Sequence, residues 1–187
     1  MTPKLVVGIS GASGVIYGIE MLRVLKDLKV ETHLILTESA KKNIEIETDF
    51  SAKAVEDLAA FVYPNSNCGA RPASGSFMHQ GMIVLPCTIK TLSGIANSYD
   101  SELLVRAADV TLKEKRKLVL MVRETPLHKG HLRLMMKAAD MGAFILPPVP
   151  AFYHQPKTIQ DIINQSLGKA LDYFEIDHEL FRRWGGA

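Results

Sequence analysis

Short apolar runs recur along the chain, and longer stretches with helical periodicity separate them. In residues 14–28, apolar side chains recur every three or four positions, which is typical of a helix with one buried face. Further helices are predicted at residues 39–48, 51–63 and 158–174. Strands are predicted at the apolar runs, which cover residues 4–10, 32–36, 81–86, 117–122 and 143–147.

This alternation of strands and helices predicts the fold class. It is typical of α/β folds, in which a mostly parallel sheet carries helices on both faces. We therefore expect a three-layer, doubly wound fold of Rossmann-like or flavodoxin-like type. Residues 64–80, rich in Pro, Gly, Ser and Asn, predict a long loop. No internal repeat or linker divides the sequence, so we expect a single domain over residues 1–187.

Composition and charge narrow the class of protein. The 187 residues carry a formal net charge of +2, and their lysines and arginines are scattered, which argues against nucleic acid as the main partner. No apolar run is long enough to predict a membrane-spanning helix, and the first residues do not resemble a signal peptide. Cys68 and Cys87 lack metal-binding spacing, as in reduced cytoplasmic proteins. We expect a cytoplasmic protein that binds neither nucleic acid nor a membrane.

Ligands of such sheets bind at the carboxyl ends of the strands, so the residues after each predicted strand are the site candidates. Hydroxyl groups, small residues and an arginine recur there. Each of these residues also has a possible structural role. Thr37, Thr88 and Thr91 are residue types that often begin helices. Arg123 and Glu124 could form an ordinary ion pair on the surface. A charged pair followed by proline at the end of a strand nevertheless favours a functional role. The candidate segments are residues 10–14, 37–39, 87–91, 123–126 and 147–156.

The segment GISGASG, residues 8–14, places three glycines directly after the first predicted strand. Glycines there let the backbone approach a phosphate. No lysine follows Gly14, which excludes a nucleoside-triphosphate loop, and the spacing GxxGxxG weakens a dinucleotide site without excluding it. Ser10 and Ser13 at a helix start suit a single terminal phosphate, such as that of flavin mononucleotide (FMN).

Other reactive side chains give weaker indications. His128, His131 and His154 lack the accompanying carboxylates of a metal site, so we expect them to be loop and helix residues, and we expect no metal. Cys87 follows a strand, but no base accompanies it, which argues against a catalytic thiol.

The chain resembles the UbiX-type flavin prenyltransferases, a family formerly described as aromatic acid or phenylacrylic acid decarboxylases. The resemblance covers nearly the whole chain and depends on many motifs in the same order. These motifs are GISGASG (8–14), ETD (47–49), PASGS (72–76), PCTIKTLSGIA (86–96), RAADVTLKE (106–114), RETPLH (123–128), PAFYHQP (150–156) and RW (183–184).

Members of that family join a dimethylallyl group from dimethylallyl monophosphate to N5 and C6 of reduced FMN. The product, prenylated FMN, serves a separate UbiD-type decarboxylase. The resemblance implies that FMN is contacted by Gly11, Ala12, Ser13, Thr37, Thr88, Ile89, Lys90, Thr91 and Arg123. It also implies that the prenyl phosphate is held or activated by Lys113, Arg123, Glu124, Tyr153 and Lys169, with Glu47 nearby.

Three positions depart from the family pattern. Threonine stands at 37 and 88, where serine is common, and this change keeps the hydroxyl. Lys169 stands where related sequences usually carry arginine, and lysine cannot form the bidentate fork that arginine offers to phosphate.

The residue types fit a reaction without a metal. The sequence has no aspartate-rich cluster to hold magnesium, so cationic side chains would stabilise the charge that develops on the leaving phosphate. Lys113, Arg123 and Lys169 are the available cations, and Tyr153 is a neutral donor. Glu124 would donate a proton to the phosphate and later accept one from the flavin. For Lys113, an i,i+4 ion pair with Asp109 is a structural alternative.

Two other functions stay open. The wider fold family includes FMN-dependent cysteine decarboxylases and proteins that only carry FMN. The former use a histidine on an early helix, and residues 14–29 contain none. The resemblance also implies a large homo-oligomer, a dodecamer, in which Glu47 and Lys113 reach the flavin of a neighbouring copy.

Overall fold

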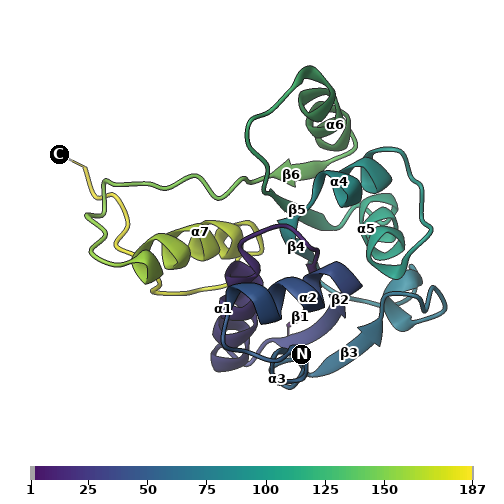
Figure 1. Cartoon of the computed structure of the whole chain (residues 1–187), viewed down its shortest axis with the longest axis horizontal. Helices are drawn as coiled ribbons and strands as arrows, with labels where there is room; N and C mark the ends of the chain where they lie inside the picture. Colours follow the sequence, from purple (N-terminus) through teal and green to yellow (C-terminus); the bar gives the residue numbers. More distant parts are fainter. Residues whose placement is uncertain (1–2, 187) are drawn as a thin grey trace.

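The computed structural model of the chain describes residues 3–186 and contains one six-stranded sheet with helices on both faces (Figure 1). Every neighbouring pair of strands is parallel, and the strand order is β3-β2-β1-β4-β5-β6. This is the order of the Rossmann-type doubly wound sheet, so the predicted fold class is confirmed. The strands are β1 (Lys4–Ile9), β2 (Glu31–Leu36), β3 (Phe61–Pro64), β4 (Gly81–Cys87), β5 (Lys117–Val122) and β6 (Ala143–Ile145).

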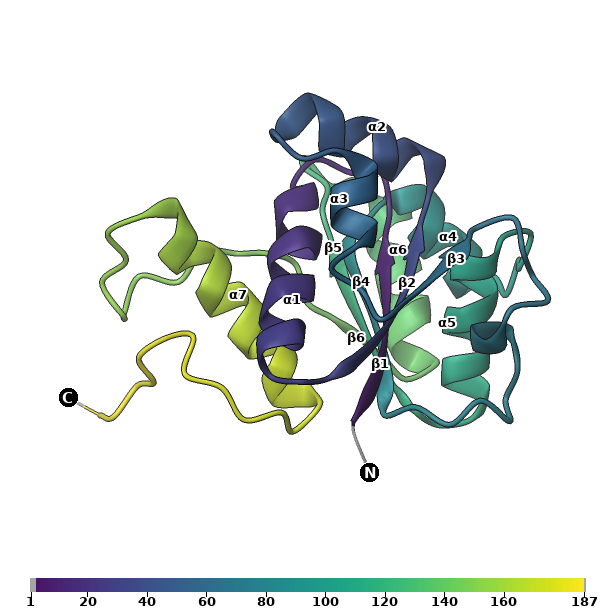
Figure 2. The same cartoon turned by 90° about the horizontal axis from the view of Figure 1, so that it is seen from below.

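The helices divide between the two faces of the sheet. Side chains of α1 (Val15–Asp27), α2 (Glu38–Glu47), α3 (Ala52–Glu56) and α7 (Ile159–Tyr173) share one core. Side chains of α4 (Ile89–Ala96), α5 (Leu103–Lys113) and α6 (Lys129–Asp140) share the other. Figure 2 shows α1 and α7 on one side of the sheet and α5 on the other. No helix within the described residues is long and apolar enough to cross a membrane.

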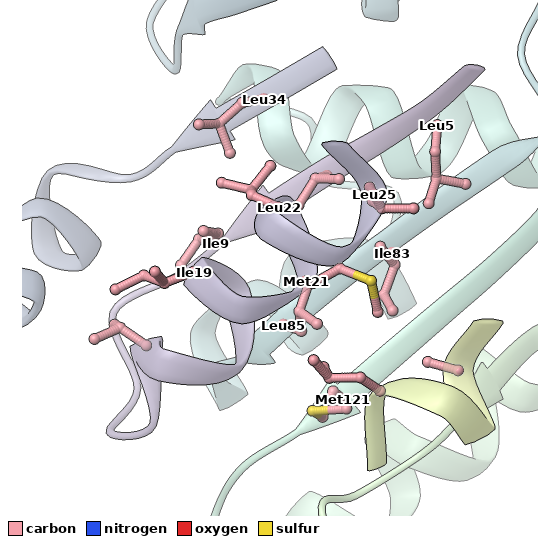
Figure 3. Packing of buried hydrophobic residues seen from close by; sticks show 14 of the residues in the cluster. Leu5, Ile9, Ile19, Met21, Leu22, Leu25, Leu34, Ile83, Leu85 and Met121 are labelled. Carbon is pink, nitrogen blue, oxygen red and sulfur yellow. The ribbon is translucent and has the colours of Figure 1, made fainter. Parts of the chain in front are cut away.

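The strands are apolar at nearly every position because the sheet is buried on both faces. In β1, Leu5, Val7 and Ile9 point into the first core, whereas Val6 points into the second. Figure 3 shows the first core, in which Ile19, Met21, Leu22 and Leu25 of α1 pack over β1, β2 and β4. This packing fixes the strand ends from which the candidate site is built.

One predicted element is wrong. We expected a helix over residues 51–63, but the chain forms the short helix α3 and then the edge strand β3. Strand β3 is short and largely exposed, and it ends in Pro64, which a sheet accepts at an edge. The following residues 65–80 form the predicted loop, apart from a short 3-10 turn, η1 (Arg71–Ala73).

Candidate functional site

The loops that follow β1, β2, β4 and β5 meet at the carboxyl edge of the sheet. Neighbouring strands β1 and β4 continue into helices on opposite faces, α1 and α4, so a crevice opens between them. Helices α1, α2 and α4 all begin at this edge, and the N-terminus of a helix favours an anion. We call this region the crevice and define it as residues 10–14, 37, 88–91 and 123–124.

The glycine loop after β1 is packed tightly against the start of α2. A Cβ atom added at Gly11 would lie 2.3 Å from Cβ of Ser39 and 2.9 Å from its carbonyl carbon. Asn43, also on α2, donates a hydrogen bond to the Gly11 carbonyl at 3.0 Å. Gly11 is therefore required for the contact with α2, whatever its contact with a phosphate. Ala12 and Ser13 complete the loop, and Ser13 is exposed.

Ser10 has a structural place that the sequence did not indicate. Its hydroxyl donates to the Pro86 carbonyl at 2.8 Å and accepts from the Thr88 N–H at 2.8 Å. The side chain is buried. Ser10 thus joins the ends of β1 and β4 inside the core, and of the two serines proposed for a phosphate only Ser13 is exposed in the loop.

Glu47 holds the N-terminus of α1. Its Oε2 accepts hydrogen bonds from the backbone N–H groups of Gly14 at 2.7 Å and Val15 at 3.3 Å. Gly14 has a left-handed φ of 92°, which glycine adopts without strain. A carboxylate is favourable here because it meets the positive end of the helix dipole. The helix start at which we expected the FMN phosphate therefore contacts a carboxylate of the same chain.

Thr37 and Thr88 begin the helices that follow β2 and β4. Thr37 Oγ1 accepts from the Ala40 N–H at 3.1 Å, and Thr88 Oγ1 accepts from the Thr91 N–H at 3.0 Å. Their helix-start role is confirmed. Thr37 is buried, and the Thr88 hydroxyl also donates to Thr91 Oγ1 at 2.9 Å. Ile89 and Lys90 form the first turn of α4, and Lys90 Nζ lies 3.2 Å from Glu102.

Arg123 and Glu124 follow β5 and are both exposed, but they form no ion pair with each other. Glu124 instead accepts a hydrogen bond from the Thr125 N–H at 3.0 Å. Burial raises the pKa of Tyr17 on α1, while a hydrogen bond from Ser166 and the positive charge of Arg123 lower it. Arg123 is therefore close enough to Tyr17 on α1 for its charge to act there, and none of the ion pairs among the described residues includes it. Tyr17 and Ser166 carry no sequence motif that would have identified them.

The thiol of Cys87 has no place in the chemistry. The side chain is fully buried at the end of β4, and burial raises its pKa to about 12. A thiolate is the reactive form of cysteine, so a thiol held protonated in the core is inert. The argument against a catalytic thiol is confirmed.

Tyr153 and Lys169 lie outside the crevice: Tyr153 is on the extended segment before α7, and Lys169 is on α7, which packs against the first core at one side of the molecule (Figure 1). We call this part of the chain the arm and define it as α7 with residues 147–158 before it and residues 175–186 after it. The Tyr153 ring is 45% exposed and meets Trp184 edge-on, with 6.1 Å between ring centroids. Lys169 Nζ lies 3.8 Å from Asp172 Oδ2. A cavity of about 380 Å³ lies between residues 153–155 and 182–186.

Lys113 lies at the end of the sheet where the strands begin, opposite the end that carries the crevice. It ends α5, which leads into the start of β5, whereas Arg123 and Glu124 follow the end of the same strand. Its ammonium group contacts Glu114, and the i,i+4 pair with Asp109 is not formed. Asp109 instead lies 3.7 Å from Arg106. Within one chain, Lys113 is therefore separated from the crevice by the length of β5.

The histidines take local roles. His128 begins α6, where its Nδ1 accepts from the Gly130 N–H at 2.9 Å, and its ring lies tilted against that of His131, with 3.6 Å between the ring centroids. His154 lies in the arm beside Tyr153. No group of three histidine, cysteine or acidic side chains within residues 3–186 is arranged to hold a metal ion.

Comparison with known proteins gives a consistent result. The family model described as Flavoprotein matches residues 1–172. The flavin prenyltransferase UbiX of Thauera aromatica is 59% identical over 183 residues, which are 98% of this chain and 94% of that protein.

Two solved structures share the fold along the chain. The crystal structure of AnUbiX (PadA1) in complex with FMN and dimethylallyl pyrophosphate has a TM-score of 0.98 and 45% identity, and covers 100% of both chains. The dodecameric FMN-dependent UbiX-like decarboxylase from Escherichia coli O157:H7 has a TM-score of 0.95 and 46% identity, covering 98% of this chain and 100% of that one.

Proposed function

The chain belongs to the flavoprotein family and, within it, to the UbiX-type flavin prenyltransferases, and from this premise we propose how its residues perform the transfer. It is an enzyme that prenylates FMN. We propose that the donor is dimethylallyl monophosphate and that the group is joined to N5 and C6 of the reduced flavin. The observation that carries this proposal is the meeting of Arg123, Glu124 and three helix N-termini in one crevice.

The crevice fits FMN as an acceptor substrate. The starts of α2 and α4, with Thr37 and residues 88–91, offer N–H and hydroxyl groups to its phosphate, and Arg123 adds a positive charge. The backbone of residues 11–13 forms the neighbouring wall. Because the Glu47 carboxylate already contacts the start of α1, we propose that it keeps the phosphate towards α2 and α4 and holds the glycine loop in place.

The transfer requires a phosphate to leave an allylic carbon. Reduced FMN supplies the electron pair at N5 that takes the dimethylallyl group. Arg123 and Lys169 would stabilise the charge on the leaving phosphate, and Tyr153 would donate a hydrogen bond to it. Glu124 is exposed and has no ion-pair partner among the described residues, so its carboxyl is available to give the phosphate a proton. The same group would accept a proton as the bond to C6 forms.

We propose that Lys113 acts on the crevice of a neighbouring copy. Its position at the opposite edge of the sheet supports this, because it cannot reach Arg123 and Glu124 of its own chain. Exposed apolar side chains on α6, such as Leu132 and Met136, suit contacts between copies. Because the related E. coli protein is dodecameric, we propose a dodecamer here as well. Glu47 contacts its own α1 and is exposed, and its reach to a neighbour's flavin stays a prediction.

A separate enzyme is expected to use the product. We propose that prenylated FMN passes to a UbiD-type decarboxylase. The support for this recipient is the family membership of the chain. The test is to mix the protein and its product with such a decarboxylase lacking cofactor, and to measure whether the decarboxylase acquires prenylated FMN.

The test of the function is the mass of the released flavin. The protein is incubated without oxygen with reduced FMN and dimethylallyl monophosphate, and the flavin is then extracted. We expect a flavin heavier by one added dimethylallyl unit, also in the presence of a metal chelator. An unchanged flavin would favour a carrier, and carbon dioxide release from a peptide ending in cysteine would favour a cysteine decarboxylase. Parallel reactions with the diphosphate donor and with oxidised FMN test the donor and the redox state.

A further inference from the structure

The arm contains a carboxylate, Asp172, that contacts Lys169 of α7 and two side chains of the C-terminal tail. We propose that Asp172 is a positioning residue: through Lys169 and through the C-terminal tail it places the donor-binding groups, without touching the donor itself. This inference rests on the proposed function, because it concerns the donor of that reaction. Here the tail means residues 175–186, the last part of the arm.

Asp172 forms a two-point contact with Arg183 of the tail. Arg183 Nη2 lies 2.7 Å from Oδ1, and Nη1 lies 3.1 Å from Oδ2. Paired N–H groups on one carboxylate fix both distance and orientation, which a single contact does not. The hydrogen bond from Arg183 is the main reason that the pKa of Asp172 lies below its usual value, so the carboxylate is ionised at neutral pH.

The same carboxylate also meets Lys169, the residue that stands in place of the family's arginine. Lys169 Nζ lies 3.8 Å from Oδ2 across one turn of α7. Asp172 therefore lies between two cations, Lys169 and Arg183. Lysine has a long flexible side chain and offers only a point charge to a phosphate, so its position depends on neighbours more than that of arginine does.

The tail lies close against α7 at Asp172. His178 is almost fully buried, and its Nε2 lies 2.9 Å from the Gly168 carbonyl and 3.1 Å from Asp172 Oδ1. Its Nδ1 accepts from the Leu180 N–H at 3.3 Å, which assigns the ring proton to Nε2. A Cβ atom added at Gly168 would lie 2.5 Å from Phe181, so the missing side chain of Gly168 makes room for the tail.

This docking brings Trp184 to Tyr153. Trp184 follows Arg183 directly, and its ring meets that of Tyr153 edge-on at 6.1 Å. The two expected donor ligands, Tyr153 and Lys169, come from different segments of the arm. Asp172 is linked to Lys169 directly and to Tyr153 through Arg183 and Trp184. The tail, through residues 182–186, forms one wall of the cavity whose other wall is residues 153–155.

The test compares Asp172→Asn with Glu175→Gln in the FMN-loaded protein. Glu175 is exposed and contacts Lys117, so its change removes one carboxylate near the same helix end and leaves the contacts of Asp172 with Lys169, His178 and Arg183 in place. For Asp172→Asn we expect the KM for dimethylallyl monophosphate to rise by about tenfold, the scale of a lost charged hydrogen bond. We expect kcat to stay within about twofold and FMN affinity to be unchanged. Asp172→Glu keeps the charge and should recover part of the loss.

Two further measurements keep the inference open to contradiction. Trp184 is the single tryptophan of the chain, so its fluorescence reports tail docking without turnover. We expect its emission to change in Asp172→Asn and in Arg183→Gln. Because the two residues act through one contact, the KM for the donor in the double variant should be little higher than in either single variant. The inference is overturned if the KM for the donor is unchanged in Asp172→Asn. It is also overturned if the effects of the two single changes on this KM add in the double variant. If the unmodified protein forms no prenylated flavin, the proposed function fails instead.

Discussion

The crevice and the arm are held in place by different forces. The crevice loops are short and begin at strands whose side chains are buried on both faces of the sheet. Their internal contacts, such as the Ser10 hydroxyl between Pro86 and Thr88, are themselves buried. In the arm, the inner face of α7 packs into the first core, but Tyr153 is 45% and Trp184 65% exposed, and polar contacts around Asp172 help to join the tail to α7. The core thus holds the loops of the crevice, whereas the exposed groups to which we assign the donor depend more on surface contacts.

This difference predicts that changes in the two regions separate kinetically. Crevice variants should change FMN binding, the chemical step or the stability of the whole domain. Arm variants should change donor binding and leave FMN binding intact. The following four predictions test this separation, beginning with the largest expected effect.

Glu124→Gln should have the largest effect, because it keeps the shape of the crevice but removes its proton donor. We expect kcat to fall by about 10²–10⁴-fold, the range for a lost acid–base group, with FMN affinity unchanged. Single-turnover kinetics and flavin titration measure the two quantities. Glu45→Gln, at an exposed position on α2, is the matched control and should run at full rate. Full activity of Glu124→Gln would show that the proton comes from elsewhere.

Gly168→Ala should disturb the arm from within. The added methyl group would overlap with Phe181 and His178, so the tail must move or α7 must shift. We expect a loss of up to about 3 kcal/mol in the free energy of unfolding and a higher KM for the donor, at unchanged FMN affinity. Gly185→Ala is the control, since no atom lies within 4 Å of its added Cβ. Equal donor KM in both variants would contradict the role of tail docking.

Ser10→Ala and Ser13→Ala separate structural from ligand contacts within the crevice. Ser10→Ala leaves the Thr88 N–H without its partner, which should lower the free energy of unfolding by about 1–2 kcal/mol even without FMN. Ser13 is exposed, so Ser13→Ala should leave the unfolding free energy unchanged and weaken FMN binding by about 0.5–1.5 kcal/mol. Denaturant unfolding and flavin titration measure both. The reverse pattern would place the phosphate at Ser10.

Lys169→Arg should have the smallest effect. Arginine keeps the positive charge and adds the bidentate fork, so we expect the KM for the donor to stay within about threefold of the original or to fall. Lys169→Ala should raise that KM and leave FMN affinity intact. Steady-state kinetics with varied donor concentration distinguish the two. A large loss in Lys169→Arg would mean that the contact with Asp172 requires lysine.

The sequence was informative where a local pattern carries the structure. Alternating apolar runs gave five of the six strands, and the rule that ligands bind beyond strand ends located the crevice. Strand β3 was missed because it is short, largely exposed and directly preceded by a helical pattern. The family motifs indicated the candidate site residues, yet they did not indicate that Lys113 lies at the opposite edge of the sheet from Glu124.

By itself, then, the sequence determined the fold class, the family and the edge of the sheet at which the candidate residues meet. Only the tertiary structure decided which partner each polar side chain takes. Glu47 contacts the N–H of Gly14, 33 residues away, and Ser10 contacts Thr88, 78 residues away. Periodicity and turn chemistry act over a few residues, so they fix helices and strands. Contacts between distant residues depend on how those elements pack, and packing follows from the whole chain at once.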